Sequence, residues 1–215
     1  MVIAQGSRNW ILTPLIFVIG FTIFSIFVNE EMKYIFLFFS FLLFLLAVFF
    51  LIFFRDPVRV PGKGIVSPAD GRIREIADIE DKLLGKCKKI SIFMNIYNVH
   101  VNRMPIDGNI NGIFHHEGSY LPAFTKESER NERVEILVDS KIGPIKIIQI
   151  AGTLARRIAP YISKGDVLKK GEKIGIIRLG SRVDIYIPSN RIKKLKIKVG
   201  DIIRAGEGSL AEIND

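Results

Sequence analysis

Two long apolar runs open the chain. Residues 11–28 and 34–54 hold no charged side chain over 18 and 21 positions. Each run is long enough to cross the hydrocarbon core of a bilayer as an α-helix. The link between them, residues 29–33 (NEEMK), is short and polar. We therefore predict that residues 1–54 form a membrane anchor, a two-helix transmembrane hairpin whose ends lie on the same side.

Basic residues around the two runs predict the orientation. Arg8 precedes the first run, and Arg55, Arg59 and Lys63 follow the second, against Lys33 alone in the link. Because basic flanks stay in the cytoplasm, we expect a cell-membrane protein with residues 55–215 on the cytoplasmic side. A signal peptide fits the first run poorly, since a second apolar run follows at once.

After residue 54 the pattern changes to short runs rich in Ile and Val, separated by Gly, Asp, Asn and Pro. Runs of this kind are typical of β-strands, and two of them are residues 173–179 and 183–188. Helical spacing occurs at 153–162, and residues 120–132 have the composition of a polar loop. The predicted fold class is mainly β (α+β).

A weak internal repeat supports this fold class. Residues 165–172 (GDVLKKGE) resemble residues 200–207 (GDIIRAGE). Such a segment marks a tight turn that enters a strand, and it recurs in lipoyl- and biotinyl-type barrel sandwiches. We therefore expect a compact domain at 55–215 that resembles a β barrel-sandwich.

The formal net charge of +9 lies entirely after residue 54, because the first 54 residues hold two basic and two acidic side chains. This excess suits nucleic acid, acidic lipid or a phosphate-bearing substrate, although a solvated basic face would explain it equally well. Cys87 is the one cysteine, so the chain has no intramolecular disulfide and no cysteine cluster for a metal. Its position before an apolar run suggests the start of a strand.

A Gly-Ser pair lies between the two predicted strands, at Gly180-Ser181. A serine hydroxyl there can attack the preceding carbonyl and convert the amide into an ester. Elimination of the ester would split the chain and leave a dehydroalanine, which hydrolyses to a pyruvoyl group. The ordinary interpretation of a Gly-Ser pair is a turn, and three other pairs occur, at Gly6, Gly118 and Gly208.

Few other residues suggest chemistry. Asp70 lies in residues 67–71 (SPADG), where an Asp-Gly turn would explain it. His100 follows a predicted strand, and the adjacent His115 and His116 would point to opposite faces of a strand. No pair has metal-ligand spacing, so we expect no metal site.

Four segments together resemble phosphatidylserine decarboxylases. Residues 67–71 (SPADG), 98–105 (NVHVNRMP), 151–157 (AGTLARR) and 179–183 (LGSRV) occur in the order found in that family. The similarity covers roughly residues 55–205 and is to the short branch, which includes archaeal archaetidylserine decarboxylases. Two membrane spans ahead of this region also fit the family.

The resemblance implies a proenzyme that cuts itself between Gly180 and Ser181. Residues 1–180 would form the β chain and residues 181–215 the α chain, with Ser181 converted to a covalent pyruvoyl group and no need for pyridoxal phosphate or metal. A Schiff base with the serine headgroup of a phospholipid would lose CO2 and release the ethanolamine lipid. The implied partners are the serine phospholipid, the anionic membrane, the two chains of one precursor and a second copy in a homodimer, without nucleic acid.

Residue roles follow from the same resemblance. His100 would transfer protons, and Asp70 would orient or charge a base near Ser181. Longer bacterial members have a second histidine where this chain has Arg103. The self-cleavage base therefore stays open between His100 alone and a site in which Arg103 stabilises charge.

Substrate contacts are further expectations. Arg156 and Arg157 are candidates for the lipid phosphate or anionic lipid, because arginine forms bidentate pairs with phosphate. His115 and His116 are candidates for the mouth through which the lipid chains enter. For each of these residues an ordinary surface position is the alternative.

Two other functions would explain parts of the sequence. A membrane-tethered carrier of the lipoyl or biotinyl type would explain the repeated turns, but it needs a modifiable lysine where this chain has residues 180–182 (GSR). A non-enzymatic β-domain adaptor would leave the Gly180–Ser181 bond intact. Ester-linked and ether-linked lipid substrates both stay open.

Overall fold

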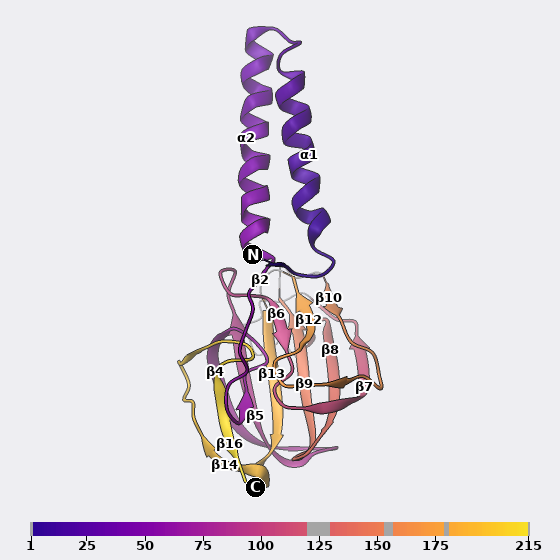
Figure 1. Ribbon diagram of the computed structural model, residues 1–215, viewed down its shortest axis with the longest axis vertical. Coiled ribbons are helices and arrows are strands. Elements are labelled where there is room, and N and C mark those ends of the chain that lie inside the picture. The colour runs from indigo at the N-terminus through magenta and orange to yellow at the C-terminus, as the bar shows by residue number, and fades with distance from the viewer. Residues whose placement is uncertain (1, 120–129, 153–156, 179–180, 215) are drawn as a thin grey trace. The chain divides into compact units, whose positions relative to one another are not determined.

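The computed structural model describes residues 2–119, 130–152, 157–178 and 181–214 (Figure 1). The chain divides into two compact units, Met1–Pro57 and Val58–Asp215. The first contains helices α1 (Arg8–Phe24) and α2 (Glu30–Phe53) and a two-stranded sheet of β1 (Val2–Ile3) and β2 (Arg55–Asp56). The second contains the other strands, so the predicted class, mainly β with a helical hairpin, is confirmed.

Helix α2 is long and apolar enough to cross a membrane. Its 24 residues are almost entirely apolar and extend over about 36 Å, more than the ~30 Å hydrocarbon core. Asn29 caps the helix by accepting a hydrogen bond from the Met32 amide at 3.0 Å. The negative charges of Glu30 and Glu31 in the first turn stabilise the helix through its dipole, whose N-terminal end is positive. Among the described residues, this helix alone meets the length and composition of a span.

The first predicted span differs from the helix that forms there. Helix α1 runs over Arg8–Phe24 rather than 11–28, and its 17 residues give a length of about 26 Å. Residues 25–28 are turns and bends, and the Ser25 hydroxyl bonds to the Thr22 carbonyl. The apolar run therefore continues about one turn beyond the C-terminal end of the helix. The prediction based on the absence of charged residues placed this end of the helix too late.

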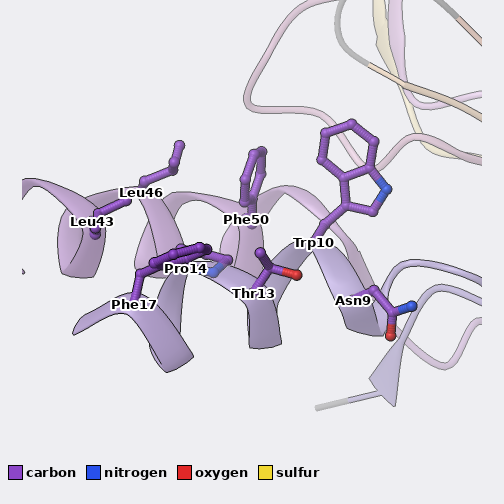
Figure 2. Close-up of a pocket in the computed structure, with 8 residues that line it drawn as sticks. All are labelled: Asn9, Trp10, Thr13, Pro14, Phe17, Leu43, Leu46 and Phe50. Carbon is purple, nitrogen blue, oxygen red and sulfur yellow. The ribbon is translucent and has the colours of Figure 1, made fainter. Parts of the chain in front are cut away.

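Contacts between α1 and α2 are both polar and aromatic. The hydroxyls of Thr22 and Ser40 lie 2.8 Å apart, and Ser40 also bonds to the carbonyl of Val18 at 3.1 Å. Phe36 packs against Phe24 with 4.8 Å between ring centroids. Small polar residues that bond across helices are typical of membrane hairpins. A hollow of about 540 Å³ lies near the other end of the pair. Figure 2 shows the residues that line it, which are Asn9, Trp10, Thr13, Pro14, Phe17, Leu43, Leu46 and Phe50.

The second unit is built on one eight-stranded antiparallel sheet in the order β11-β7-β8-β9-β13-β5-β4-β15. Two three-stranded sheets, β10-β12-β6 and β14-β16-β3, complete it. The bounds of its elements are β3 Ile65–Val66, β4 Gly71–Asp81, β5 Gly85–Met94, β6 Val101–Arg103, β7 Gly108–His116, β8 Arg133–Ser140, β9 Gly143–Ala151, β10 Ile158–Pro160, β11 Val167–Leu168, β12 Lys173–Ile177, β13 Ser181–Pro188, η2 Ser189–Arg191, β14 Ile192–Leu195, β15 Ile202–Ile203 and β16 Ser209–Ile213.

Strand β13 lies at the centre of the large sheet, between β5 and β9. Val183, Ile185 and Ile187 face one side and are fully buried, together with isoleucines of both neighbouring strands. Side chains alternate between faces along a strand, so Ser181 shares this apolar side. The hydrophobic pattern that predicted the strand therefore also places Ser181 toward the interior.

The two repeated segments have equivalent places in the fold. Gly165 and Gly200 begin them with φ of +96° and +99°, a conformation that glycine adopts without strain. The strands that follow, β11 and β15, form the two opposite edges of the large sheet. The predicted turns into strands are thus confirmed, and they close both edges of the sheet in the same way.

The helix predicted at 153–162 is wrong over the part that the structure describes. Residues 158–160 form strand β10, which pairs with β12 through Ile158 opposite Ile177. Ile158 and Ile162 are both buried. The apolar spacing therefore came from a strand and the segment after it, and residues 153–156 lie outside the described residues.

Candidate functional site

Ser181 is the first residue of β13 and is fully buried. In the sheet it lies opposite Met94, the last residue of β5, and Ala151, the last residue of β9. Its hydroxyl donates a hydrogen bond to the Met94 sulfur at 3.2 Å. Thioether sulfur is a weak acceptor, so the hydroxyl is oriented toward the interior without being strongly held.

A chain of buried polar side chains starts at the same sulfur. The Asn102 amide donates to it at 3.7 Å, and the Asn102 oxygen accepts from the Gln149 amide at 2.7 Å. Asn102 belongs to β6 in the small sheet, whereas Gln149 belongs to β9 beside Ser181. The pair therefore ties the strand that follows His100 to the sheet that carries Ser181.

We expect that replacing Gln149 with leucine weakens both the fold and the alignment of the site. The substitution leaves the Asn102 oxygen buried without its donor, which costs about 1–3 kcal/mol. A double-mutant cycle with Asn102→Ala, followed by thermal unfolding in detergent, should give a coupling of about 0.5–3 kcal/mol. If the effects of the two substitutions on the free energy of unfolding are additive, the hydrogen bond between these amides does not contribute to stability.

His100 is fully buried, directly before β6. Its Nδ1 lies 2.9 Å from the Asn98 carbonyl oxygen, and its own carbonyl accepts from the Ile177 amide at 3.3 Å. A carbonyl oxygen only accepts, so Nδ1 carries the proton and Nε2 is the basic nitrogen. The Ile177 contact attaches His100 to the strand that ends four residues before Ser181.

The Asp70 carboxylate lies within a dense set of hydrogen-bond donors. The Arg59 guanidinium donates to both of its oxygens, at 3.1 and 2.9 Å, and the Ala205 amide donates at 2.7 Å. Arg59 also bonds to Glu207 at 2.9 Å. Asp70 directly precedes β4, which is two strands from β13 in the sheet, a separation of about 10 Å.

Arg103 lies in the same neighbourhood as Arg59 and is buried. Its guanidinium donates to the Gly171 carbonyl at 3.0 Å. This hydrogen bond connects β6 to the first repeated segment. A Cβ on Gly206, in the second repeated segment, would lie 3.1 Å from the Arg103 side chain and 3.9 Å from the Arg59 side chain. The two repeated turns therefore converge on the arginines beside Asp70.

The other candidates are spread along the same end of the large sheet. His115 is half exposed and lies 3.2 Å from Glu132, while His116 is partly buried at the end of β7. Arg157 is exposed, and its carbonyl accepts from the Arg178 amide at 3.3 Å. Arg156 and Gly180 lie outside the described residues. The structure thus gathers Ser181, His100 and Asp70 toward one end of the sheet, with the histidine pair at the strand two beyond β9.

Arg182 follows Ser181 but faces the opposite side of the sheet. It forms an ion pair with Asp184 at 3.0 Å, and both line a hollow of about 260 Å³ with Arg133, Glu135, Ile148, Ile150 and Tyr186. Burial raises the pKa of Asp184, although Arg182 and Lys89 act to lower it. This hollow is therefore separate from the side that the Ser181 hydroxyl faces.

Cys87 lies in β5 and is fully buried. Burial raises the pKa of its thiol, so it stays protonated at neutral pH and is a poor nucleophile. Among the described residues, no group of three His, Cys, Asp or Glu side chains could hold a metal ion.

Sequence reasoning missed the residues that support the site. Met94 and Gln149 sit in apolar runs, where a single methionine or amide carries no separate signal, and Asn102 lies in the segment 98–105, where the pattern gives it no separate role. The sequence indicates a role in membrane orientation for Arg59, whereas in the structure its guanidinium binds Asp70. The nearest available signal was the repeated segment itself, since Ala205 and Glu207 of its second copy complete the contacts of Asp70 and Arg59.

Comparisons with known proteins agree on one family. The family model described as phosphatidylserine decarboxylase matches residues 46–211. The chain is 39% identical over 215 residues to the "putative archaetidylserine decarboxylase proenzyme" of Methanosarcina barkeri, covering 98% of each chain. It is 47% identical over 159 residues to the phosphatidylserine decarboxylase proenzyme of Thermobifida fusca, covering 74% of this chain and 70% of that one.

Proposed function

This chain belongs to the phosphatidylserine decarboxylase family, and we propose that it decarboxylates the serine headgroup of a phospholipid after cutting itself between Gly180 and Ser181. The observation that carries the proposal is the position of Ser181. It opens the central strand β13 with its hydroxyl inside the β domain, bonded to the sulfur that also binds Asn102 of the strand after His100. A reacting group formed at this residue would be shielded from bulk water.

Self-cleavage begins when the Ser181 oxygen attacks the Gly180 carbonyl carbon. A C–O bond forms, the C–N bond breaks, and the amine of residue 181 takes up a proton, so the amide becomes an ester. Removal of the Ser181 α-proton then breaks the Cβ–O bond, and Gly180 leaves with a carboxylate. Water displaces ammonia from the resulting dehydroalanine and leaves a pyruvoyl group. No external oxidant or reductant is needed.

The surroundings of Ser181 fit such a group. Met94, Ala151 and Val183 provide an apolar lining, and the Asn102 amide provides a hydrogen-bond donor near the same sulfur. A pyruvoyl group supplies a ketone that condenses with the headgroup amine and accepts the electrons released as CO2 leaves. The burial of these residues excludes water that would compete for the ketone.

His100 is the residue proposed to move protons. The Asn98 carbonyl lies 2.9 Å from Nδ1, so the other ring nitrogen, Nε2, is the atom that we propose takes a proton and later returns it. Its contact with Ile177 keeps the ring near the strand that leads to Ser181. Because the described hydrogen bonds of Asp70 go to Arg59 and Ala205, we propose that Asp70 acts through the electrostatics and position of this cluster.

The membrane is the proposed site of action. Helix α2 is long and apolar enough to anchor the chain, and the basic flanks favour a cytoplasmic catalytic domain. The names of the relatives include both phosphatidylserine and archaetidylserine decarboxylase proenzymes. We therefore propose a serine phospholipid as the substrate. The experiment below distinguishes ester-linked from ether-linked lipid chains.

The test uses the full-length protein in detergent with lipids labelled in the serine carboxyl carbon. One lipid has ester-linked chains and the other has ether-linked chains. The proposal predicts release of labelled CO2 from at least one of them, and loss of activity when cyanoborohydride is added with the substrate. Cleaved protein that releases no CO2 from either lipid would overturn the proposed reaction.

A further inference from the structure

A row of basic side chains crosses the end of the large sheet at which Ser181 lies. The strand registers align Arg72, Phe93, Arg182, Ile150, Arg133 and His116 from β4 to β7. This row holds three arginines and one histidine, and no carboxylate. It comes one residue after the row of Met94, Ser181 and Ala151, counting along β13.

Not all of this charge is available to a partner. Arg182 is buried and paired with Asp184. Arg72 is exposed, and so is its neighbour Arg74, whose guanidinium lies 5.6 Å from the centre of the Phe93 ring. The exposed part of the charge is therefore concentrated at the β4 side of the row.

An apolar turn projects from the same end of the sheet. Residues 95–98 follow β5, and within them Tyr97 is 78% exposed and Ile96 is 38% exposed. Side-chain oxygens hold the turn, since the Tyr97 amide donates to Asn95 at 2.9 Å and the Asn95 amide donates to Asn98 at 2.9 Å. The turn therefore presents two large apolar side chains to the surroundings in a fixed backbone conformation.

The turn at the other end of β5 provides a comparison. There Leu83 is 65% exposed, and its amide donates to Asp81 at 2.9 Å. The ten residues of β5 separate the two turns by about 30 Å. The charges near Leu83 are mixed, with Glu80 and Asp81 beside Lys82 and Lys86, so only the Ser181 end combines an apolar turn with an excess of arginine.

We propose that the end of the sheet formed by the 95–98 turn, Arg72 and Arg74 is the surface with which the β domain meets an anionic bilayer. Tyrosine favours the membrane interface because it joins an apolar ring to a polar hydroxyl. Arginines beside it pair with lipid phosphates. The inference rests on the proposed function and deepens it, because Ser181 begins β13 at this same end of the sheet, one residue nearer to the end than the row of Arg72 and Arg182.

The experiment places a fluorescent probe at each end of β5. Trp10 is the only tryptophan, so Trp10→Phe removes the background fluorescence. Either Tyr97→Trp or Leu83→Trp is then added to this variant. The full-length protein is reconstituted in nanodiscs of phosphatidylglycerol with brominated chains. We expect a blue-shifted emission and at least twofold bromine quenching for Tyr97→Trp, and neither for Leu83→Trp. Equal quenching at both positions, or none at position 97, would overturn the proposal. A blue shift without quenching at position 97 would indicate a protein contact and would also overturn it.

A second arm tests the charge. Arg72→Glu with Arg74→Glu should reduce the quenching at position 97 toward the level in neutral nanodiscs, whereas Lys82→Glu with Lys86→Glu should not. Unchanged quenching in the arginine variant would overturn the electrostatic part. Bromine quenching requires neither cleavage nor CO2 release. Quenching without CO2 release would therefore contradict only the proposed function, and CO2 release without quenching would contradict only the proposed membrane surface.

Discussion

Replacing Ser181 with alanine should leave the precursor as a single uncut chain with decarboxylation at background level. Alanine has no hydroxyl to attack the Gly180 carbonyl, so neither the ester nor the pyruvoyl group can form. The lost hydrogen bond goes to the Met94 sulfur, a weak acceptor, so removing it should cost no more than about 1 kcal/mol. Denaturing electrophoresis and labelled CO2 release measure the two losses, and thermal unfolding shows whether the variant is folded.

Ser209 offers a matched control for this substitution. It also follows a glycine and also opens a strand, β16, but it lies in the small sheet β14-β16-β3. Ser209→Ala should therefore mature and turn over like the unaltered chain. Cleavage that persists in Ser181→Ala, or that disappears in Ser209→Ala, would show that the bond before residue 181 is not the one that reacts.

Replacing His100 with asparagine should reduce decarboxylation by about 10²–10⁴-fold while preserving the fold. That range is typical for the removal of a general acid–base group. The asparagine amide can take the place of Nδ1 as donor to the Asn98 carbonyl, but it provides no basic nitrogen in place of Nε2. The substitution thus separates the structural contact at 2.9 Å from proton transfer.

The rate is measured per cleaved chain, so that slow maturation is not counted as slow decarboxylation. Turnover within about threefold of the unaltered rate would remove His100 from the chemistry. A variant that stays uncut would instead assign His100 to the self-cleavage step, whose base the sequence left open.

The sequence predicted those parts of the molecule that depend on local pattern. The apolar pattern predicted a strand at 183–188, which the structure extends back to Ser181, and the glycines of the repeated segments marked two turns that the structure confirms. The same reasoning failed at residues 158–160, because Ile158 is buried by its pairing with Ile177 in another strand. Spacing along the chain cannot distinguish that burial from the face of a helix.

Contacts between distant segments were out of reach for the same reason. Asp70 and Arg59 are eleven residues apart, but the Ala205 amide that completes the cluster comes from 135 positions further along the chain. Gln149 meets Asn102 only because β9 and β6 belong to sheets that pack together. Single polar residues in apolar runs become informative once the partners across the interior are known.

The intact mass of the purified full-length protein distinguishes a self-cleaved enzyme from an uncut chain. Self-cleavage before Ser181 should give two chains, one ending at Gly180 and one comprising residues 181–215 with a pyruvoyl group in place of the N-terminal serine. Incubation with anionic lipid before the measurement allows for incomplete maturation in the expression host. A single chain of unaltered mass after that incubation, with serine intact at position 181, would show that the chain does not form a pyruvoyl group.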